Sequence, residues 1–110
     1  MDNCIFCKII SGEISADLMY EDDRVVVFRD MIPQAPFHIL IIPKSHYSSI
    51  KDINDESLIG HLFVIGNKIA KEENIDNFRY IINTGEEAGQ TVFHLHIHLM
   101  GGRAMNWPPG

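Results

Sequence analysis

Apolar positions recur at helical spacing along one long stretch in the middle of the chain. On one side of this stretch lie Leu58, Leu62, Ile65 and Ile69. A repeat of three to four residues predicts an amphipathic helix. Asn54 fits the N-cap position, and Asp55 and Glu56 bring negative charge to the first turn, where the helix dipole favours it. The pattern therefore predicts one long helix that starts at about Asp55.

Several shorter stretches are rich in β-branched and aromatic residues or alternate with period two, as strands do. They cover residues 18–22, 25–30, 37–43, 78–83 and 91–100. A brief helix over residues 4–10, ended by Ser11 and Gly12, precedes them. Hairpins before and after the long helix favour an α+β fold with an antiparallel sheet. Residues 1–110 have the length of a single domain, and no linker interrupts them.

Composition and charge narrow the classes of function. With 45% hydrophobic and 22% charged residues the chain is globular, and its net charge of −6 argues against a general nucleic-acid binder. No apolar stretch reaches the roughly 18 to 20 residues of a membrane span, and the N-terminus lacks a signal-peptide pattern. We therefore expect no membrane partner and an intracellular, cytoplasmic protein, which in a eukaryote could also enter the nucleus. In a reducing compartment, Cys4 and Cys7 indicate a metal half-site or a redox pair rather than a structural disulfide.

The stretch "HLHIHLM", residues 94–100, carries the main candidate chemistry. Alternation with aliphatic residues places His94, His96 and His98 on one face of the predicted strand. Imidazole is nucleophilic and also accepts a proton near pH 7, so metal ligation and nucleophilic attack on phosphorus are the competing roles. A single ion bound by all three rings would strain the strand. A glycine-bearing loop with Gly85 and Gly89 precedes them, which favours a phosphate site.

At this point the chain resembles a known family. "HLHIHLMGG" is similar to the signature of the histidine-triad (HIT) superfamily, in which histidines alternate with apolar residues. The stretches "IFCKII", "YEDD", "IPQAPFHILIIPKSH" and "INTGEEAGQTVFHLHIHLMGGRAMNWPPG" resemble its Hint branch, the histidine-triad nucleotide-binding purine nucleoside phosphoramidases. The resemblance implies a HIT fold, in which a five-stranded antiparallel sheet carries one long and one short helix. It also implies that the sheets of two copies join in a homodimer.

The resemblance further implies an activity. Nucleoside 5′-monophosphates whose phosphorus carries an amine, such as AMP or GMP phosphoramidates, would be hydrolysed through a covalent nucleotidyl-histidine intermediate. His96 would be the nucleophile, His98 would contact the phosphate and protonate the leaving amine, and His38 would support both rings. The phosphate contacts would come from Asn83, Gly89, Gln90 and Thr91.

By the same resemblance, Asp30 would accept the ribose hydroxyls. The base would lie against an apolar slot made of Ile5, Phe6, Ile9, Phe28, Met31 and Leu40. Trp107 would reach the partner subunit's site on the leaving-group side. Asn106 stands where the family often has a histidine, which leaves the preferred leaving group open.

Cys4 and Cys7 supply two thiolates of a possible tetrahedral zinc site. His46 and His94 are the candidates for the remaining ligands, and the resemblance to zinc-binding relatives with a matching set points the same way. Such a zinc would be structural, and no organic cofactor is expected. Three alternative functions stay open: a dinucleoside polyphosphate hydrolase or nucleotidyl transferase of the same superfamily, a metal hydrolase, and a non-catalytic nucleotide-binding partner protein.

Overall fold

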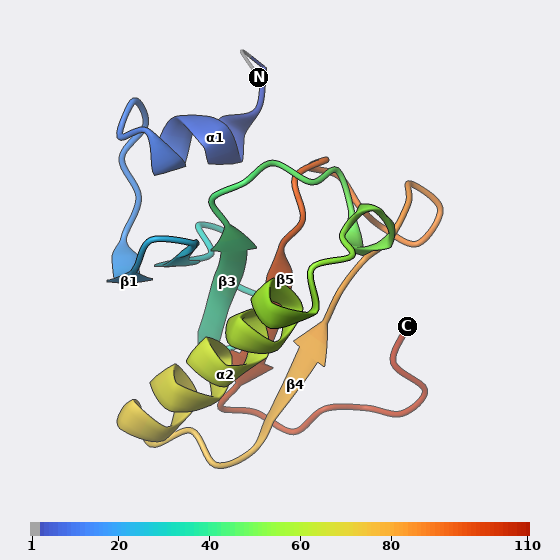
Figure 1. Cartoon of the computed structure of the whole chain (residues 1–110). Coiled ribbons are helices and arrows are strands. Elements are labelled where there is room, and N and C mark those ends of the chain that lie inside the picture. The colour runs from blue at the N-terminus through green and yellow to red at the C-terminus, as the bar shows by residue number, and fades with distance from the viewer. Residues whose placement is uncertain (1–2) are drawn as a thin grey trace.

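The computed structural model describes residues 3–110 and contains two α-helices, a short 3₁₀ turn and five strands (Figure 1). In chain order they are α1 (Ile5–Ile10), β1 (Leu18–Glu21), β2 (Val25–Arg29), β3 (Phe37–Pro43), η1 (Ile50–Asp52), α2 (Glu56–Glu72), β4 (Phe78–Ile81) and β5 (Ile97–Gly101). No helix within residues 3–110 is long and apolar enough to cross a bilayer.

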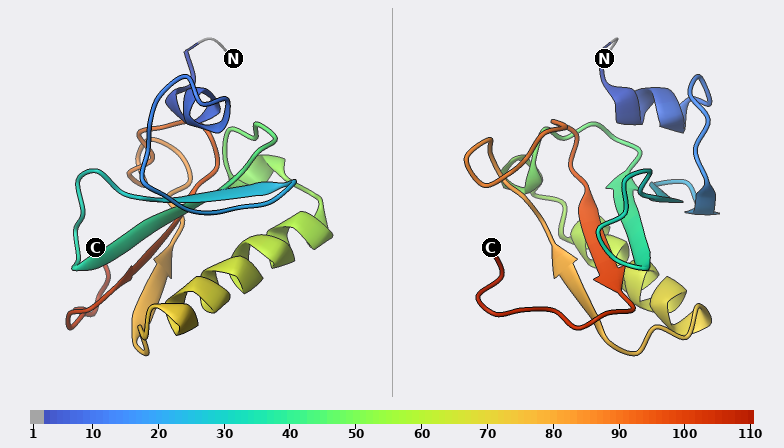
Figure 2. Two further views of the ribbon diagram at one scale, coloured as in Figure 1. Left: turned by 90° about the vertical axis from the view of Figure 1, so that its left-hand side faces the viewer. Right: turned by 180° about the vertical axis from the view of Figure 1, so that it is seen from behind.

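The strands form one antiparallel sheet in the order β1-β2-β3-β5-β4. The long helix α2 crosses one face of this sheet, and α1 lies on the opposite side (Figure 2). The α+β fold with one long and one short helix, expected from the sequence, is thereby confirmed. Strand β4 forms one edge of the sheet and, among residues 3–110, pairs only with β5.

Two apolar clusters hold the helices on their respective faces of the sheet. Because successive strand residues point to opposite faces, Ile39 and Ile41 of β3 pack toward α2, while Leu40 and Ile42 pack toward α1. Every residue of β3 is buried, which fits its central place. Leu95, which precedes β5, and Ile97 and Leu99 of β5 join the α2 cluster. The three triad histidines are therefore directed to the α1 side.

Two of the predicted boundaries differ from the structure for a clear physical reason, and the other predicted ends differ by at most two residues. The N-cap of α2 is Asp55 rather than Asn54, and its side chain accepts a hydrogen bond of 3.1 Å from the backbone N–H of Leu58. The final strand begins at Ile97 rather than at residue 91, because the preceding backbone leaves the ladder: Leu95 donates its N–H to the carbonyl oxygen of Tyr47. The side-chain alternation nevertheless continues through this irregular segment.

Two glycines of α2 provide a matched test of the α2–sheet packing. A Cβ at Gly66 would lie 2.5 Å from the Tyr80 hydroxyl and 2.7 Å from Ile41 Cδ1, whereas a Cβ at Gly60 would meet nothing within 4 Å. We expect Gly66→Ala to lower the free energy of unfolding by about 1 to 3 kcal/mol, the usual cost of overpacking. Gly60→Ala should raise it by about 0.5 to 1 kcal/mol through helix propensity. Urea unfolding measures both, and equal effects would contradict this packing.

Candidate active site and metal cluster

His96 lies buried under α1, with its ring held from two sides. Its Nδ1 is 2.8 Å from the carbonyl oxygen of His94, so the proton of the neutral ring resides on Nδ1 and the Nε2 lone pair remains available. The Phe6 ring meets it edge-on at a centroid distance of 5.1 Å. Burial lowers the pKa of His96, against smaller opposing effects of the His94 hydrogen bond and of Asp30. A neutral imidazole with an oriented lone pair has the state that a nucleophile requires.

His98 and His38 form a second pair on adjacent strands. The backbone N–H of Gln34 donates to His38 Nδ1 at 3.0 Å, so neutral His38 carries its proton on Nε2. That nitrogen lies 2.9 Å from His98 Nδ1 and donates to it. Neutral His98 must then carry its own proton on Nε2. The hydrogen bonds thus give His98 an N–H on the side away from His38.

The electrostatics of this pair keep both rings neutral near pH 7. Burial lowers the pKa of His98 to about 4, and the neighbouring His96 and His38 rings add to the effect. Burial also lowers the pKa of His38. Asp30 opposes both shifts without reversing them, since its Oδ2 lies 3.3 Å from His38 Nε2. The other Asp30 oxygen accepts the Ile32 N–H at 2.9 Å, which fixes the carboxylate beside the histidines.

Four residues from distant parts of the chain form a second cluster. Cys4, Cys7, His46 and His94 bring their ligand atoms within 4.8 Å of one another. His94 is completely buried, and its Nε2–H donates to the carbonyl oxygen of Pro43 at 2.8 Å. Its Nδ1 lone pair therefore faces the cluster. The predicted ligand set is brought together as the sequence suggested.

The distances in this cluster suit a tetrahedral metal ion. His94 Nδ1 lies 3.3 Å from Cys4 Sγ, 3.6 Å from Cys7 Sγ and 3.1 Å from His46 Nδ1. Ligands of a tetrahedral zinc ion at ordinary bond lengths are separated by roughly 3.3 to 3.8 Å. Burial and the neighbouring Cys4 raise the pKa of Cys7 to about 11, so in the absence of a cation this thiol keeps its proton. Both thiols are free, and the cluster could hold a metal.

The loop between β4 and His94 is shaped by glycines and by one buried amide. Gly85 and Gly89 have φ values of +90° and +98°, in the region that glycine adopts without strain. The Gln90 side chain accepts from Gly85 N–H and donates to the carbonyl oxygens of Ser48 and Val92, and its backbone N–H donates to Gly85. The backbone N–H and the side-chain NH₂ of Gln90 thus all donate to carbonyl oxygens of this chain.

The other predicted phosphate residues flank this loop. The Asn83 side chain lies against Gly89, 3.7 Å from the position a Cβ would take there. Thr91 lines a hollow of about 500 Å³ together with the metal-cluster residues Cys4 and His46. The end of this loop at Thr91 therefore lies next to two of the four residues of the Cys/His cluster.

The predicted base slot is only partly assembled. Phe6, Ile9, Phe28 and Leu40 lie together in the buried cluster under α1. Ile5 is 44% exposed and Met31 is 83% exposed, so neither belongs to that cluster, because one lies on the outer side of α1 and the other in the loop after β2. Trp107 is also 83% exposed, in a C-terminal segment that runs beyond the outer edge of β4 (Figure 1). Within this single chain the exposed Trp107 side chain is not packed against the triad histidines.

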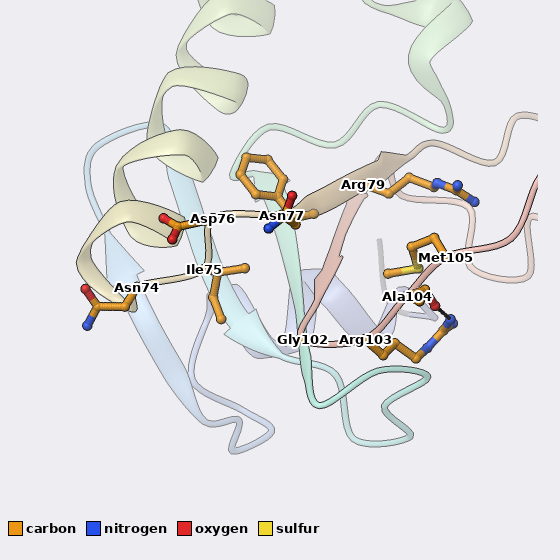
Figure 3. Close-up of a pocket in the computed structure, with 10 residues that line it drawn as sticks. Asn74, Ile75, Asp76, Asn77, Arg79, Gly102, Arg103, Ala104 and Met105 are labelled. Carbon is orange, nitrogen blue, oxygen red and sulfur yellow. Dashed lines mark hydrogen bonds between the residues drawn. The ribbon is translucent and has the colours of Figure 1, made fainter.

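A large hollow of the surface lies away from this chemistry. It measures about 900 Å³ and opens between the α2–β4 turn and the segment after β5 (Figure 3). It is lined by residues 74–79 and 102–105, and none of these is a histidine or a cysteine. We therefore place the candidate site at the histidines and not in this hollow.

Other contacts could not be expected from the sequence. His61, interpreted there as a packed or partly exposed side chain, pairs with Asp22 Oδ2 at 2.6 Å and connects α2 to the β1–β2 turn. Backbone groups of Gln34 and Pro43 orient His38 and His94. A backbone donor or acceptor leaves no signal in the side-chain pattern.

The antiparallel sheet leads into a segment with histidines at alternating positions, and one of them, His96, has its ring oriented for nucleophilic attack. These features define a histidine-triad protein. Residues 3–107 match the family model described as "Scavenger mRNA decapping enzyme C-term binding". A HIT-like protein of uncharacterised function from Synechococcus elongatus is 50% identical over 99% of this chain and 98% of its own length. The chain belongs to the histidine-triad superfamily.

Solved structures agree with this assignment. A HIT family hydrolase from Legionella pneumophila superposes with a TM-score of 0.95 at 46% identity, covering 98% of this chain and all of its own. A histidine-triad nucleotide-binding protein from Candida albicans gives a TM-score of 0.85 at 32% identity, covering 96% of this chain and 83% of its own. The fold and the family name support a hydrolase.

The lowered pKa of His98 predicts how stability depends on pH. The unfolded chain binds a proton at the ordinary value of 6.5, whereas folded His98 does so only at about 4. The unfolded state therefore holds more protons in between, and the free energy of unfolding falls as the pH is lowered from 6.5 to 4. We expect His98→Gln to make this fall shallower in urea titrations across that range. An unchanged slope in the variant would contradict a depressed pKa at His98.

Proposed function

We propose that this chain is a nucleoside phosphoramidase. Its substrates would be purine nucleoside 5′-monophosphates of the AMP-amine or GMP-amine type, and the reaction would pass through a nucleotide bound to His96. The observation that carries the proposal is the buried hydrogen bond from His96 Nδ1–H to the His94 carbonyl oxygen, which leaves Nε2 as the attacking atom. The similar structure from Candida albicans is a histidine-triad nucleotide-binding protein, which supports a nucleotide ligand here.

The proposed reaction has two displacements at one phosphorus. His96 Nε2 attacks, a P–N bond to the imidazole forms, and the P–N bond to the amine breaks. His98 Nε2–H donates a hydrogen bond to the leaving nitrogen and passes its proton to it, and the positive charge that forms on the phosphorylated His96 ring offsets the negative charge left on His98 until water restores the proton. Water then attacks the phosphorus, gives its proton to His98 and releases nucleoside monophosphate from His96. General acid help of this kind contributes about 10²- to 10⁴-fold.

The binding assignments follow the positions of the polar groups. Asp30, fixed by Ile32 N–H, would accept the ribose hydroxyls. The phosphate would meet neutral donors from Asn83, Gly89 and Thr91, and Gln90 would hold that loop in shape. The base would lie against the cluster under α1, with Ile5 and Met31 as exposed flanks. A cradle without lysine or arginine suits attack on phosphorus by a neutral imidazole.

For the metal cluster we propose a structural zinc ion. Cys4, Cys7, His46 and His94 would occupy all four positions of a tetrahedral site, so the ion would leave no place for water and would supply rigidity only. His94 would anchor α1 to the backbone that orients His96. An intracellular, reducing location would keep both thiols available as ligands.

We also propose a homodimer. Strand β4 is an edge strand, and an open edge offers unpaired backbone groups to a second copy. The C-terminal segment runs past this edge (Figure 1), where Trp107 would reach the partner subunit's leaving-group side. The exposed Trp107 side chain would then be buried on association.

The proposed activity predicts the outcome of a substrate panel. Wild-type protein should turn over AMP and GMP phosphoramidates faster than diadenosine polyphosphates. His96→Ala should lose about 10³-fold or more of the rate, because the covalent route is removed. Its AMP affinity, measured by calorimetry, should stay close to that of the wild type. The matched control is His61→Gln, a histidine outside the site, which should keep full activity.

Each rival function has its own result in this panel. Faster turnover of the polyphosphates would favour the dinucleoside hydrolase or transferase. Activity abolished by a chelator at an intact fold would favour a metal hydrolase. AMP binding without turnover would favour a non-catalytic partner protein. More than a tenth of wild-type activity in His96→Ala would remove His96 as the nucleophile.

The zinc proposal predicts a stoichiometry. Metal analysis of protein purified with reduced thiols should find about one zinc per chain. The double variant Cys4→Ala with Cys7→Ala should contain almost none and melt at a lower temperature, because metal binding contributes to folding. His61→Gln again serves as the control and should keep its zinc. A wild-type value near zero, with melting insensitive to chelator, would leave the cysteines as packing residues.

A further inference from the structure

The loop between β2 and β3 is closed around His38 by backbone hydrogen bonds. Asp30 N–H donates to the His38 carbonyl oxygen at 3.0 Å, and Gln34 N–H donates to His38 Nδ1 at 3.0 Å. The Gln34 side chain is used within the same loop, since its Nε2 donates to the Ile32 carbonyl oxygen. Gln34 N–H and the Asp30 carboxylate, whose Oδ2 lies 3.3 Å from His38 Nε2, both belong to this loop and both favour the tautomer with the proton on Nε2. The position of the loop therefore decides which His38 nitrogen accepts.

A side chain from the far end of the sequence holds that backbone. Arg103 Nε donates to the carbonyl oxygen of Gln34 at 3.0 Å, and its Nη1 donates to the carbonyl oxygen of Ala104 at 2.9 Å. Figure 3 shows the second of these bonds, with the guanidinium folded back along its own segment. The planar fork of an arginine can hold two carbonyls at once. Arg103 thus ties the C-terminal segment to the loop that orients His38.

The neighbouring glycines allow this approach. Gly102 has φ +90°, and a Cβ there would lie 3.1 Å from Pro36 Cβ, so the segment crosses the loop in close contact. A Cβ at Gly101 would lie 2.6 Å from Ile75 Cγ2 and 2.8 Å from the carbonyl oxygen of Asn77. The chain at the end of β5 is therefore packed between the β2–β3 loop and the α2–β4 turn. This packing places Arg103 beside Gln34.

We propose that Arg103 is a positioning residue for the His38–His98 pair. By holding the Gln34 backbone, it determines which ring nitrogen of each histidine carries the proton. With Gln34 N–H in place, His38 must donate from Nε2, and His98 keeps its proton on the opposite nitrogen. If the Gln34 backbone moves away, His38 is able to carry its proton on Nδ1 and to accept from His98. His98 then presents a lone pair where the leaving amine needs a proton. The catalytic consequence rests on the proposed function, whereas the effect on His38 does not.

The test compares Arg103→Ala with Arg79→Ala by two readouts. Arg79 donates to the Asn106 carbonyl oxygen, so it also ties down the C-terminal segment, and within residues 3–110 it makes no hydrogen bond to the 30–36 loop. Long-range ¹H–¹⁵N NMR of histidine-labelled protein should show His38 protonated on Nε2 in the wild type and in Arg79→Ala, and a second tautomer in Arg103→Ala. On an AMP phosphoramidate, Arg103→Ala should lose about tenfold or more in kcat with KM within about twofold.

The two readouts separate this proposal from the proposed function. A wild-type His38 protonated on Nδ1, or an unchanged His38 spectrum in Arg103→Ala, would overturn the positioning role whatever the activity. A changed tautomer with unaltered kcat in an active enzyme would also overturn it for the reaction. A wild type without phosphoramidase activity would refute the proposed function, and the NMR comparison would still decide the role of Arg103. Thermal melting of both variants confirms that each remains folded.

Discussion

The hydrogen bond between His96 Nδ1–H and the His94 carbonyl oxygen is the contact on which the rest of the site depends. It is buried and 2.8 Å long, and it joins the candidate nucleophile to a residue whose ring is itself held. His94 Nε2 donates to Pro43, and Nδ1 faces the two cysteines. One residue therefore connects β3, α1 and the nucleophile. The position of α1 and the orientation of His96 therefore depend on the same residue, His94.

Burial decides the protonation state of this histidine face. The pKa values of His38, His94, His96 and His98 are all lowered, with burial as the largest cause in each case. Charged rings so close together would also repel one another. Neutral rings instead donate through one nitrogen and accept through the other, so a chain of directed hydrogen bonds becomes possible. The cost is sensitivity to acid, because protonation removes the acceptor nitrogens of His38 and His98 on which their hydrogen bonds depend.

The two faces of the sheet have different roles. One face packs against α2, and the other carries the candidate active-site histidines under α1. The α2 side of the sheet is filled by aliphatic residues, among them Ile41 and Leu62, both inaccessible to solvent. The α1 side carries the histidines, and the short helix covers them with Phe6, which touches both His94 and His96. A six-residue helix has little stability of its own, so its position depends on these contacts and on Cys4 and Cys7. The cluster of Cys4, Cys7, His46 and His94 therefore ties this helix to the rest of the chain.

Local pattern in the sequence determined much of this molecule. The spacing of Leu62 and Ile65 defined α2, and the alternation through Leu95 and Ile97 assigned the histidines to one face, because periodicity reports which side of an element is buried. The boundaries were less accurate: Asp55 rather than Asn54 caps α2, since either residue type can cap and only the backbone geometry chooses.

Only the tertiary structure decided which distant residues meet. The resemblance indicated Cys4 and His94 as joint metal ligands. Their contact, however, spans 90 positions and depends on how α1 packs against the segment that contains His94. The bond between Arg103 and Gln34 spans 69 positions, and it uses a backbone carbonyl. Every residue has such a group, so no side-chain pattern can mark it. The folded chain selects one carbonyl by bringing it within reach of Arg103, and this selection is what the sequence alone left undetermined.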